Sequence, residues 1–151
     1  MPCHSAIVKN LITITTETTV ENALKRMKKD KITILPIVDQ HNIICGYFSA
    51  AILLKNILPV PVNMGGGAQL DLTVSAAPGI AKRLHKIQSL PIETFMERKL
   101  RKVSGETPTW EGLKIIAEHG APLFVVEEDT GKLTGMMTEI SAIEELERQQ
   151  E

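Results

Sequence analysis

The residue types that most often carry out chemistry are few and scattered in this chain. The histidines lack the close spacing of zinc ligands, and the two cysteines do not form a spaced pair. These residues are His4, His41, His85, His119, Cys3 and Cys45. The run Gly65–Gly67 lacks the Lys-Ser/Thr that ends a phosphate-binding loop, so it is interpreted as part of a linker. The sequence therefore predicts neither an enzyme nor a metal site.

Composition and charge narrow the class of protein further. Apolar residues make up 43% of the 151 residues and the net charge is −1, which suits a globular domain and argues against a nucleic-acid binder. The basic clusters Lys25–Lys31 and Arg98–Lys102 are interpreted as solvated faces. No apolar run reaches the roughly 18–20 residues that cross a bilayer, and Met1–Ser5 does not resemble a secretion signal. A cytoplasmic protein without direct membrane insertion is expected.

The strongest feature of the sequence is an internal repeat. Three pairs of blocks match, Glu17–Lys25 with Glu106–Lys114, Leu35–Asp39 with Leu123–Glu127, and Gly46–Ser49 with Gly135–Thr138. Their offsets are 89, 88 and 89 positions, so one deletion and one insertion reconcile them. The chain therefore contains two copies of one structural unit.

Each copy predicts the order β-α-β-β-α, which gives an α+β fold with two small sheets. The expected strands are Ile12–Thr15, Ile34–Val38, Ile43–Phe48, Lys102–Ser104, Leu123–Val126 and Leu133–Met137. Thr18 and Glu21 predict a capping box at the first helix, and Thr107 is expected to cap the corresponding helix of the second copy. Trp110, in the first turn of that helix, is expected to pack against the protein.

Proline and glycine residues separate the two copies. We expect the first repeat at residues 1–57, a linker at 58–98 and the second repeat at 99–151. The stretch Pro78–Ile87 predicts a short helix within the linker, because Ile80, Leu84 and Ile87 share one face. Both a functional role and a flexible excursion remain open for this segment.

Three motifs in fixed order resemble the CBS (cystathionine β-synthase-type) domain. They are Thr19–Leu24 (TVENAL), Leu35–Asp39 (LPIVD) and Gly46–Ser49 (GYFS), with weaker counterparts at Glu111–Leu113, Val125–Glu127 and Gly135–Thr138. The resemblance implies two tandem repeats that pack through their sheets as a pseudo-twofold (Bateman) module, and modules that pair as a homodimer. It also implies clefts that bind AMP, ADP, ATP or S-adenosylmethionine and regulate an attached or associated protein.

The resemblance assigns candidate site residues by position. The hydroxyls of Ser49 and Thr138 would lie near the sugar or the phosphates, where helix amides favour an anion; otherwise they only cap their helices. Four residues before the second strands would flank the base, namely Ile32, Thr33, Gly120 and Ala121. Lys31 and His119 would meet phosphate or belong to the plain surface.

Two positions depart from the family pattern. Many nucleotide-binding members carry an acidic residue three positions after the hydroxyl, where this chain has Ile52 and Ser141. Ile52 offers no acceptor for a ribose diol, whereas Ser141 can accept a hydrogen bond. We therefore expect one ligand per chain, bound with micromolar or weaker affinity in the cleft of Thr138 and Ser141.

Three functions follow from these observations. The first is a regulatory, ligand-sensing module; the second is a structural dimerisation module without a nucleotide; the third is a subunit that gates a transporter or an enzyme. A homodimer built from helices is expected in each case. The candidate contacts are Ala50, Leu53, Leu54, Ile140 and Ile143.

Overall fold

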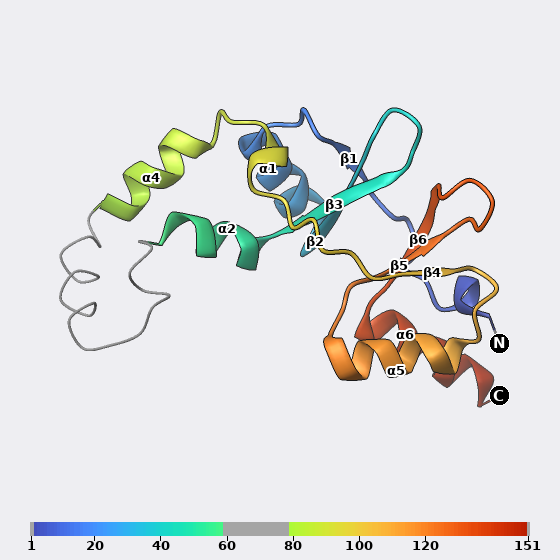
Figure 1. Ribbon diagram of the computed structural model, residues 1–151. Coiled ribbons are helices and arrows are strands. Elements are labelled where there is room, and N and C mark those ends of the chain that lie inside the picture. The colour runs from blue at the N-terminus through green and yellow to red at the C-terminus, as the bar shows by residue number, and fades with distance from the viewer. Residues whose placement is uncertain (1, 59–78, 151) are drawn as a thin grey trace. The chain divides into compact units, whose positions relative to one another are not determined.

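A computed structural model describes residues 2–58 and 79–150 of the chain, and Gly65–Gly67 and Pro78 lie outside these ranges. The described part holds two three-stranded sheets and five α-helices (Figure 1). In chain order the elements are η1 (Cys3–Ser5), β1 (Ile14–Thr15), α1 (Val20–Asp30), β2 (Ile34–Val38), β3 (Ile44–Ser49), α2 (Ala50–Ile57), α4 (Ile80–Ile87), η4 (Ile92–Thr94), β4 (Lys102–Ser104), α5 (Thr109–His119), β5 (Leu123–Val126), β6 (Leu133–Met137) and α6 (Glu139–Gln149). The order β-α-β-β-α occurs twice, so the predicted α+β class is confirmed.

The first sheet has the order β1-β2-β3. β1 runs parallel to β2, with Ile14 opposite Ile37, and α1 makes the crossover that a parallel pair requires. β3 begins at Ile44, one residue after the predicted start, because the Ile43 amide donates to the Asp39 carboxylate in the preceding turn (3.0 Å). The predicted helix in the linker is confirmed as α4, which begins at Ile80.

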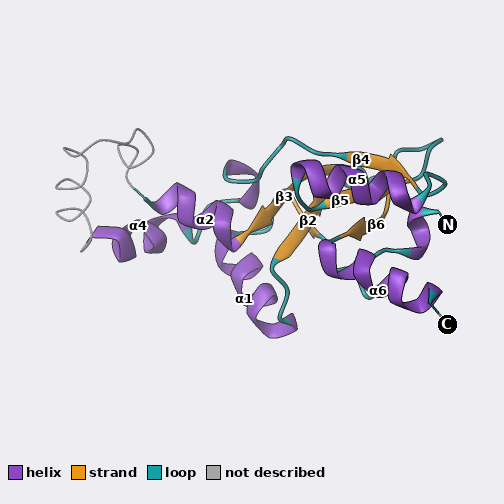
Figure 2. Cartoon of the chain, turned by 90° about the horizontal axis from the view of Figure 1, so that it is seen from below, coloured by secondary structure: helices purple, strands orange, loops and turns teal. Residues whose placement is uncertain are grey.

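The second sheet repeats the arrangement with the order β4-β5-β6. β4 is parallel to β5, and β5 is antiparallel to β6, with Leu123 opposite Met137. Figures 1 and 2 show α5 and α6 side by side against this sheet. Their apolar faces close a core of buried side chains, made of Cys3, Ala6, Ile116, Leu123, Val125, Met137 and Ala142.

The capping box predicted for Thr18 and Glu21 is wrong. α1 begins one residue later than that box requires, and Thr19 is its N-cap, accepting a hydrogen bond from the amide three residues on (3.2 Å). Thr18 has another role, because its carbonyl accepts a hydrogen bond from the amide of Ile92 (2.7 Å). A contact distant in sequence therefore fixes where the helix starts.

The second copy departs from prediction in the same way. α5 begins at Thr109 without a side-chain cap, and the carbonyl of Thr107 accepts a hydrogen bond from the amide of Cys3 (2.7 Å). The expected cap at Thr107 is therefore wrong. The expected packing of Trp110 is also wrong, since 63% of its surface is exposed.

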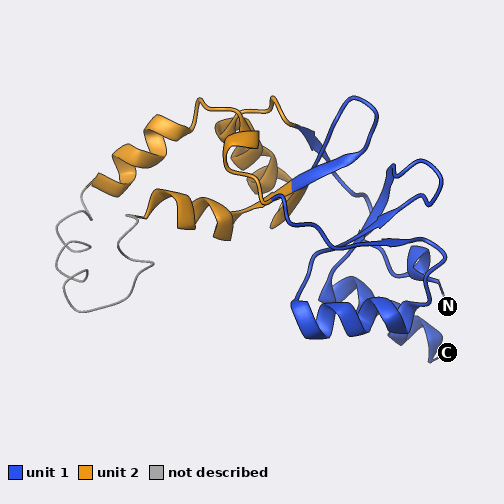
Figure 3. Ribbon diagram, viewed as in Figure 1, with its two compact units in different colours: residues 1–15, 36–46, 98–151 blue, residues 16–35, 47–97 orange. Residues whose placement is uncertain are grey.

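Residues 2–9, which precede β1 at the start of the first repeat, pack within the second repeat; we call them and residues 92–98, which precede β4, the leading segments. Residues 1–15 belong to one compact unit with residues 36–46 and 98–151 (Figure 3). The amide of Val8 donates to the carbonyl of Met136 in β6 (2.8 Å), and Ala6 is fully buried. This segment therefore pairs with part of the outer edge of β6, and the amide of Leu133, at the start of that strand, donates to the carbonyl of Asn42 (2.9 Å).

The segment that precedes the second repeat occupies the same place in the other compact unit, residues 16–35 and 47–97. Ile92 is fully buried, and the backbones of Glu97 and Tyr47 exchange two hydrogen bonds (2.9 and 3.0 Å). Tyr47 and Met136 lie 89 positions apart, as do Glu97 and Val8. The internal repeat therefore includes both leading segments.

Gly135 tests the fit of the leading segment against β6. A Cβ at this position would lie 2.7 Å from Cγ2 of Ile7, closer than packed atoms allow. We expect Gly135→Ala to lower the free energy of unfolding by about 1–3 kcal/mol, as overpacked substitutions do. Gly105→Ala is the matched control, because its Cβ would approach the nearest atom, Cβ of His4, only to 3.5 Å.

Urea denaturation of both variants measures the difference. Combining Gly135→Ala with Ile7→Ala should give less destabilisation than the two single effects added together. Strictly additive effects would contradict direct packing between Ile7 and β6.

Candidate functional site

A cavity of about 320 Å³ lies between the leading segment and α6, within one compact unit. Its lining residues are Ile7, Val8, Lys9, Thr138, Ile140, Ser141, Glu144 and Arg148. The volume falls at the small end of the range seen for ligand pockets, roughly 300–1,000 Å³. Thr138 and Ser141, two of the predicted site residues, are thus brought together on one cavity.

Thr138 and Ser141 form a capping box at the start of α6. The Thr138 hydroxyl accepts a hydrogen bond from the Ser141 amide (3.1 Å), and the Ser141 hydroxyl accepts one from the Thr138 amide (2.9 Å). The sequence signature of a capping box has Glu or Gln at the third helical position, and serine takes that place here. Both hydroxyls therefore orient the first turn of the helix that borders the cavity.

Ser141 also ties α6 to the leading segment. Its hydroxyl donates to the carbonyl of Ala6 (2.7 Å), and the residue is only 6% exposed. A serine hydroxyl has a single proton, and the hydrogen bond to the Ala6 carbonyl uses it. Ser141 consequently shapes the cavity wall, and little of its surface faces a ligand.

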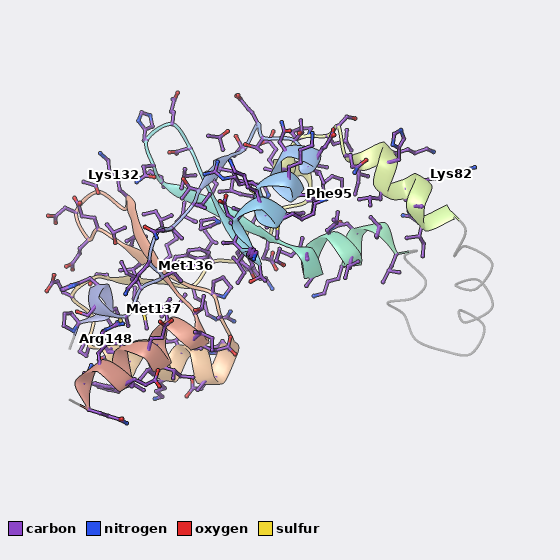
Figure 4. All side chains as sticks on the ribbon, turned by 180° about the vertical axis from the view of Figure 1, so that it is seen from behind. Lys82, Phe95, Lys132, Met136, Met137 and Arg148 are labelled. Carbon is purple, nitrogen blue, oxygen red and sulfur yellow. The ribbon has the colours of Figure 1, made fainter. Side chains whose placement is uncertain are left out.

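Arg148 lies seven residues after Ser141, about two turns further along α6 (Figure 4). Its Nε donates to the carboxylate of Glu145 (2.9 Å), and its Nη2 donates to the same carboxylate and to the carbonyl of Ser5 (3.1 Å). The hydrogen bond from Arg148 lowers the pKa of Glu145, although burial opposes the shift. The ionised pair therefore stabilises the fold above the ordinary pKa of glutamate, and the contribution is lost as the pH falls through the lowered pKa.

Lys9 and Glu144 are the remaining charged groups of the cavity. Both side chains are exposed, and neither makes an ion pair with another described residue. Glu144 lies three residues after Ser141, on the same face of α6. The cavity thus offers a carboxylate that accepts hydrogen bonds, an ammonium group and the partly used guanidinium of Arg148.

The apolar part of the lining comes from Ile7, Val8 and Ile140. Such side chains contact the faces of a planar or apolar group, while the charged residues can fix its polar substituents. The arrangement therefore suits a small ligand with one flat apolar part, hydroxyl donors and a negative charge.

No group of histidines, cysteines and carboxylates within the described ranges could hold a metal ion.

The predicted site residues of the first repeat lie in the other compact unit. Ser49 caps α2 by accepting a hydrogen bond from the amide of Ile52 (3.2 Å), and Ile52 is half-buried. Lys31 is the exposed C-cap of α1, and Ile32 and Thr33 follow it before β2. These residues are not part of the cavity lined by Thr138.

The remaining predicted residues of the second repeat lie between α5 and β5. His119 is exposed at the end of α5, with its ring 3.9 Å from the carboxylate of Glu118. Gly120 and Ala121 are half-buried in the connection to β5. Like the residues of the first repeat, none of them lines the cavity of Thr138.

Sequence reasoning missed six lining residues, which are Ile7, Val8, Lys9, Ile140, Glu144 and Arg148. Of these, Ile140 was expected only as a dimer contact. A helical signal for Glu144 and Arg148 was present, because they follow Ser141 by three and seven residues and share its face. Residues 7–9 precede α6 by about 130 positions, and no local pattern connects the two.

Among the described residues, no helix is long and apolar enough to cross a membrane.

Ser141→Ala tests the structural role of this hydroxyl. The variant loses the acceptor for the Thr138 amide and leaves the buried carbonyl of Ala6 without the Ser141 donor, while the amide of residue 141 still donates to the Thr138 hydroxyl. An unsatisfied buried group costs about 1–3 kcal/mol, so the unfolding free energy in urea should fall by that amount. Ser89→Ala, an exposed serine, should change it by less than about 0.5 kcal/mol. Equal stability of the two variants would contradict this role.

Solved structures with the same fold cover nearly the whole chain. CBSX2 from Arabidopsis thaliana has 20% identity and a TM-score of 0.75, covering 99% of this chain and 96% of its own. A structure described as CBSX2 in complex with AMP has 21% identity and a TM-score of 0.73, covering 99% and 98%. Protein MJ1004 from Methanocaldococcus jannaschii has 20% identity and a TM-score of 0.72; the match covers 98% of this chain and 60% of MJ1004.

The family match agrees with these structural likenesses. A search of curated protein sequences gives no match. The CBS domain model matches residues 5–59 and again residues 92–148. These two ranges coincide with the two repeats and include most of each leading segment. The chain therefore belongs to the CBS domain family and contains a pair of CBS domains.

Proposed function

We propose that this chain is a regulatory module, without catalysis of its own, that binds one adenosyl ligand in the cavity between residues 7–9 and α6. The observation that carries the proposal is the lining of that cavity, which combines apolar walls with Lys9, Glu144 and Arg148. The complex of CBSX2 with AMP supports an adenine nucleotide as the ligand. A nucleotide of the size of AMP suits the small cavity better than ATP does.

Each part of AMP has a chemical counterpart in the lining. The adenine ring would lie against Ile7, Val8 and Ile140, whose side chains are apolar. The ribose diol would donate to Glu144, which takes over the role of the acidic residue missing at Ser141. The phosphate would meet Lys9 and the amides at the start of α6, where the helix dipole favours an anion.

The first repeat lacks an equivalent set of groups. The positions that match Ser141 and Glu144 at the 89-residue offset are Ile52 and Lys55. An isoleucine cannot accept a hydrogen bond, and a lysine can only donate. A ribose diol would leave its hydroxyls unmet there, which supports one ligand per chain.

Isothermal titration tests the proposed site. We expect one AMP per chain, with micromolar or weaker affinity, and weaker binding of ADP, ATP and S-adenosylmethionine. Glu144→Gln should weaken AMP binding about tenfold or more, because hydrogen bonds to a charged group contribute about 1.5–3 kcal/mol. Lys9→Gln should also weaken it, and binding of AMP should decline with salt.

Glu128→Gln and Lys132→Gln are matched controls, since both residues are exposed in the same unit and lie outside the cavity. If AMP binds equally well to Glu144→Gln and is lost on Ser49→Ala, the ligand occupies the first repeat instead. Absence of any adenosyl binding would favour a structural dimerisation module.

We also propose that the chain acts as a homodimer that couples the ligand to an associated enzyme or transporter. Of the expected contact residues, Leu54 and Ile143 are 56% and 50% exposed, and Ala50 is exposed as well. Ile140 is exposed but lines the ligand cavity. The expectation that Leu53 contacts a partner is wrong, because this side chain is only 6% exposed within its own chain.

Exposed apolar side chains of this size favour association, because water contact with them is unfavourable. Sedimentation velocity at tens of micromolar should therefore show a dimer. A single monomeric species across that concentration range would contradict the proposed assembly.

A further inference from the structure

The helix between the two repeats, α4, carries positive charge only. Lys82, Arg83 and Lys86 are exposed, and the helix contains no acidic residue (Figure 4 labels Lys82). None of these three side chains makes an ion pair with another residue of the described ranges. The chain as a whole has a net charge of −1, so α4 is a local concentration of positive charge. We call the three residues the basic face of α4.

The other side of α4 is apolar and only partly covered. Ile80, Leu84 and Ile87 recur at helical spacing on one side, and each is half-buried. α4 lies beside α2 (Figures 1 and 2), yet none of its residues is fully buried. Leu90, three residues after the helix, is 39% exposed. Apolar surface therefore remains open to solvent next to the basic face.

The C-terminal end of α4 is fixed to the start of α1. The amides of Val20 and Glu21 donate to the carbonyls of Leu90 (3.0 Å) and Gln88 (2.9 Å). Both amides belong to the first turn of α1, where helical amides have no partner within their own helix. α4 is therefore a built part of its compact unit, and whatever holds its basic face also holds α1.

A membrane surface fits α4 better than a nucleic acid or a protein does. Single strands of nucleic acid are held by stacking on aromatic side chains as well as by charge, and α4 has no aromatic residue. A stable protein interface covers about 800 Å² of each partner, whereas a helix of 8 residues is only about 12 Å long. A bilayer needs no matched shape, and its interfacial zone accepts both basic and apolar side chains.

We propose that the basic face of α4 binds the surface of a membrane rich in anionic phospholipid. Lys82, Arg83 and Lys86 contact the headgroups, and Leu90 enters the interfacial zone beside them. The contact is peripheral and reversible, because it uses a few charges that salt can screen. The inference goes beyond the proposed nucleotide site, with which it shares no residue.

Co-sedimentation with vesicles tests the proposal on the full chain. We expect binding to vesicles of equal parts phosphatidylcholine and phosphatidylglycerol, and little binding to phosphatidylcholine alone. Binding should be strongest in about 0.01 M salt and lost in about 1 M salt, since the screening length falls from about 30 Å to about 3 Å. Equal binding to both kinds of vesicle, or no binding to the anionic ones at low salt, would overturn the proposal.

Neutralising the basic face locates the contact. The triple variant Lys82→Gln, Arg83→Gln and Lys86→Gln should lower the partition coefficient about a hundredfold in about 0.1 M salt. Each basic residue near an anionic surface strengthens binding about fivefold, and glutamine keeps a high helix propensity. Thermal unfolding confirms that the variant is folded, and AMP titration of the same variant reports separately on the nucleotide site.

A matched control removes the same charge elsewhere. Lys28→Gln, Lys29→Gln and Lys114→Gln change exposed lysines on α1 and α5. This variant should bind within about threefold of the native chain, because charges more than about 10 Å from the membrane are screened at this salt concentration. An equal loss in both triple variants would show a response to total charge and would overturn the assignment to α4.

A fluorescent label gives a readout that does not depend on charge. Ala81→Cys on α4 and Ala117→Cys on α5 place a bimane dye at exposed positions, above the background of the native chain with Cys3 and Cys45. Anionic vesicles should shift the emission of the dye at position 81 to the blue and leave the dye at position 117 unchanged. The reverse pattern would overturn the proposal.

Competition distinguishes the membrane from other anions. Inorganic phosphate should release the chain from vesicles no better than chloride of the same ionic strength. Stronger release by phosphate would indicate a site for the free ion, and would overturn the membrane proposal. Tighter binding of the native chain to an oligonucleotide or to polyglutamate than to anionic vesicles would overturn it as well.

Discussion

The backbone pairing of each leading segment with the last strand of a repeat is the constraint on which the rest of the structure depends. Each sheet has only three strands, and its outer strand would leave a row of amides and carbonyls unpaired. Val8 covers Met136 in one unit, and Glu97 covers Tyr47 in the other. Small sheets with one helical layer bury little surface alone, so a covered edge is a substantial gain.

The cavity beside α6 is a consequence of this pairing. One wall is the segment that follows η1, and the other is the face of α6 that carries Ile140, Ser141, Glu144 and Arg148. The bond from the Ser141 hydroxyl to the Ala6 carbonyl holds the two walls together, and Arg148 adds a bond to Ser5. A ligand that bridges both walls would therefore act directly on the contact that completes the unit. That position is suited to a regulatory signal, because ligand binding stabilises whichever state holds the walls in place.

The sequence was informative about the fold because the fold is repeated and its strands are apolar. Five of the six strands lie close to their predicted places, and the hydroxyls of Ser49 and Thr138 cap helices in both copies. Helix starts at Thr18 and Thr107 were wrong, since their carbonyls are held by residues more than 70 positions away. Local pattern cannot show such contacts.

The site was harder to predict for the same reason. Thr138 and Ser141 were found because they follow a strand and start a helix, a local feature. Lys9 was missed because its link to α6 exists only once the leading segment has crossed to the second repeat. Glu144 was missed because the acidic residue was expected at position 141. Glu144 lies three residues later, about one helical turn along the same face of α6.

The two repeats share a backbone plan but have diverged in the chemistry of their surfaces. At matching positions the first repeat has Ile52, Lys55 and Glu21, and the second has Ser141, Glu144 and Trp110. The first two differences affect the face of the helix that would border a ligand, and the third affects an outer face. A symmetric pair would present the same groups at the start of α2 and at the start of α6. Divergence at these few positions is enough to distinguish one repeat from the other, while the order of strands and helices stays the same.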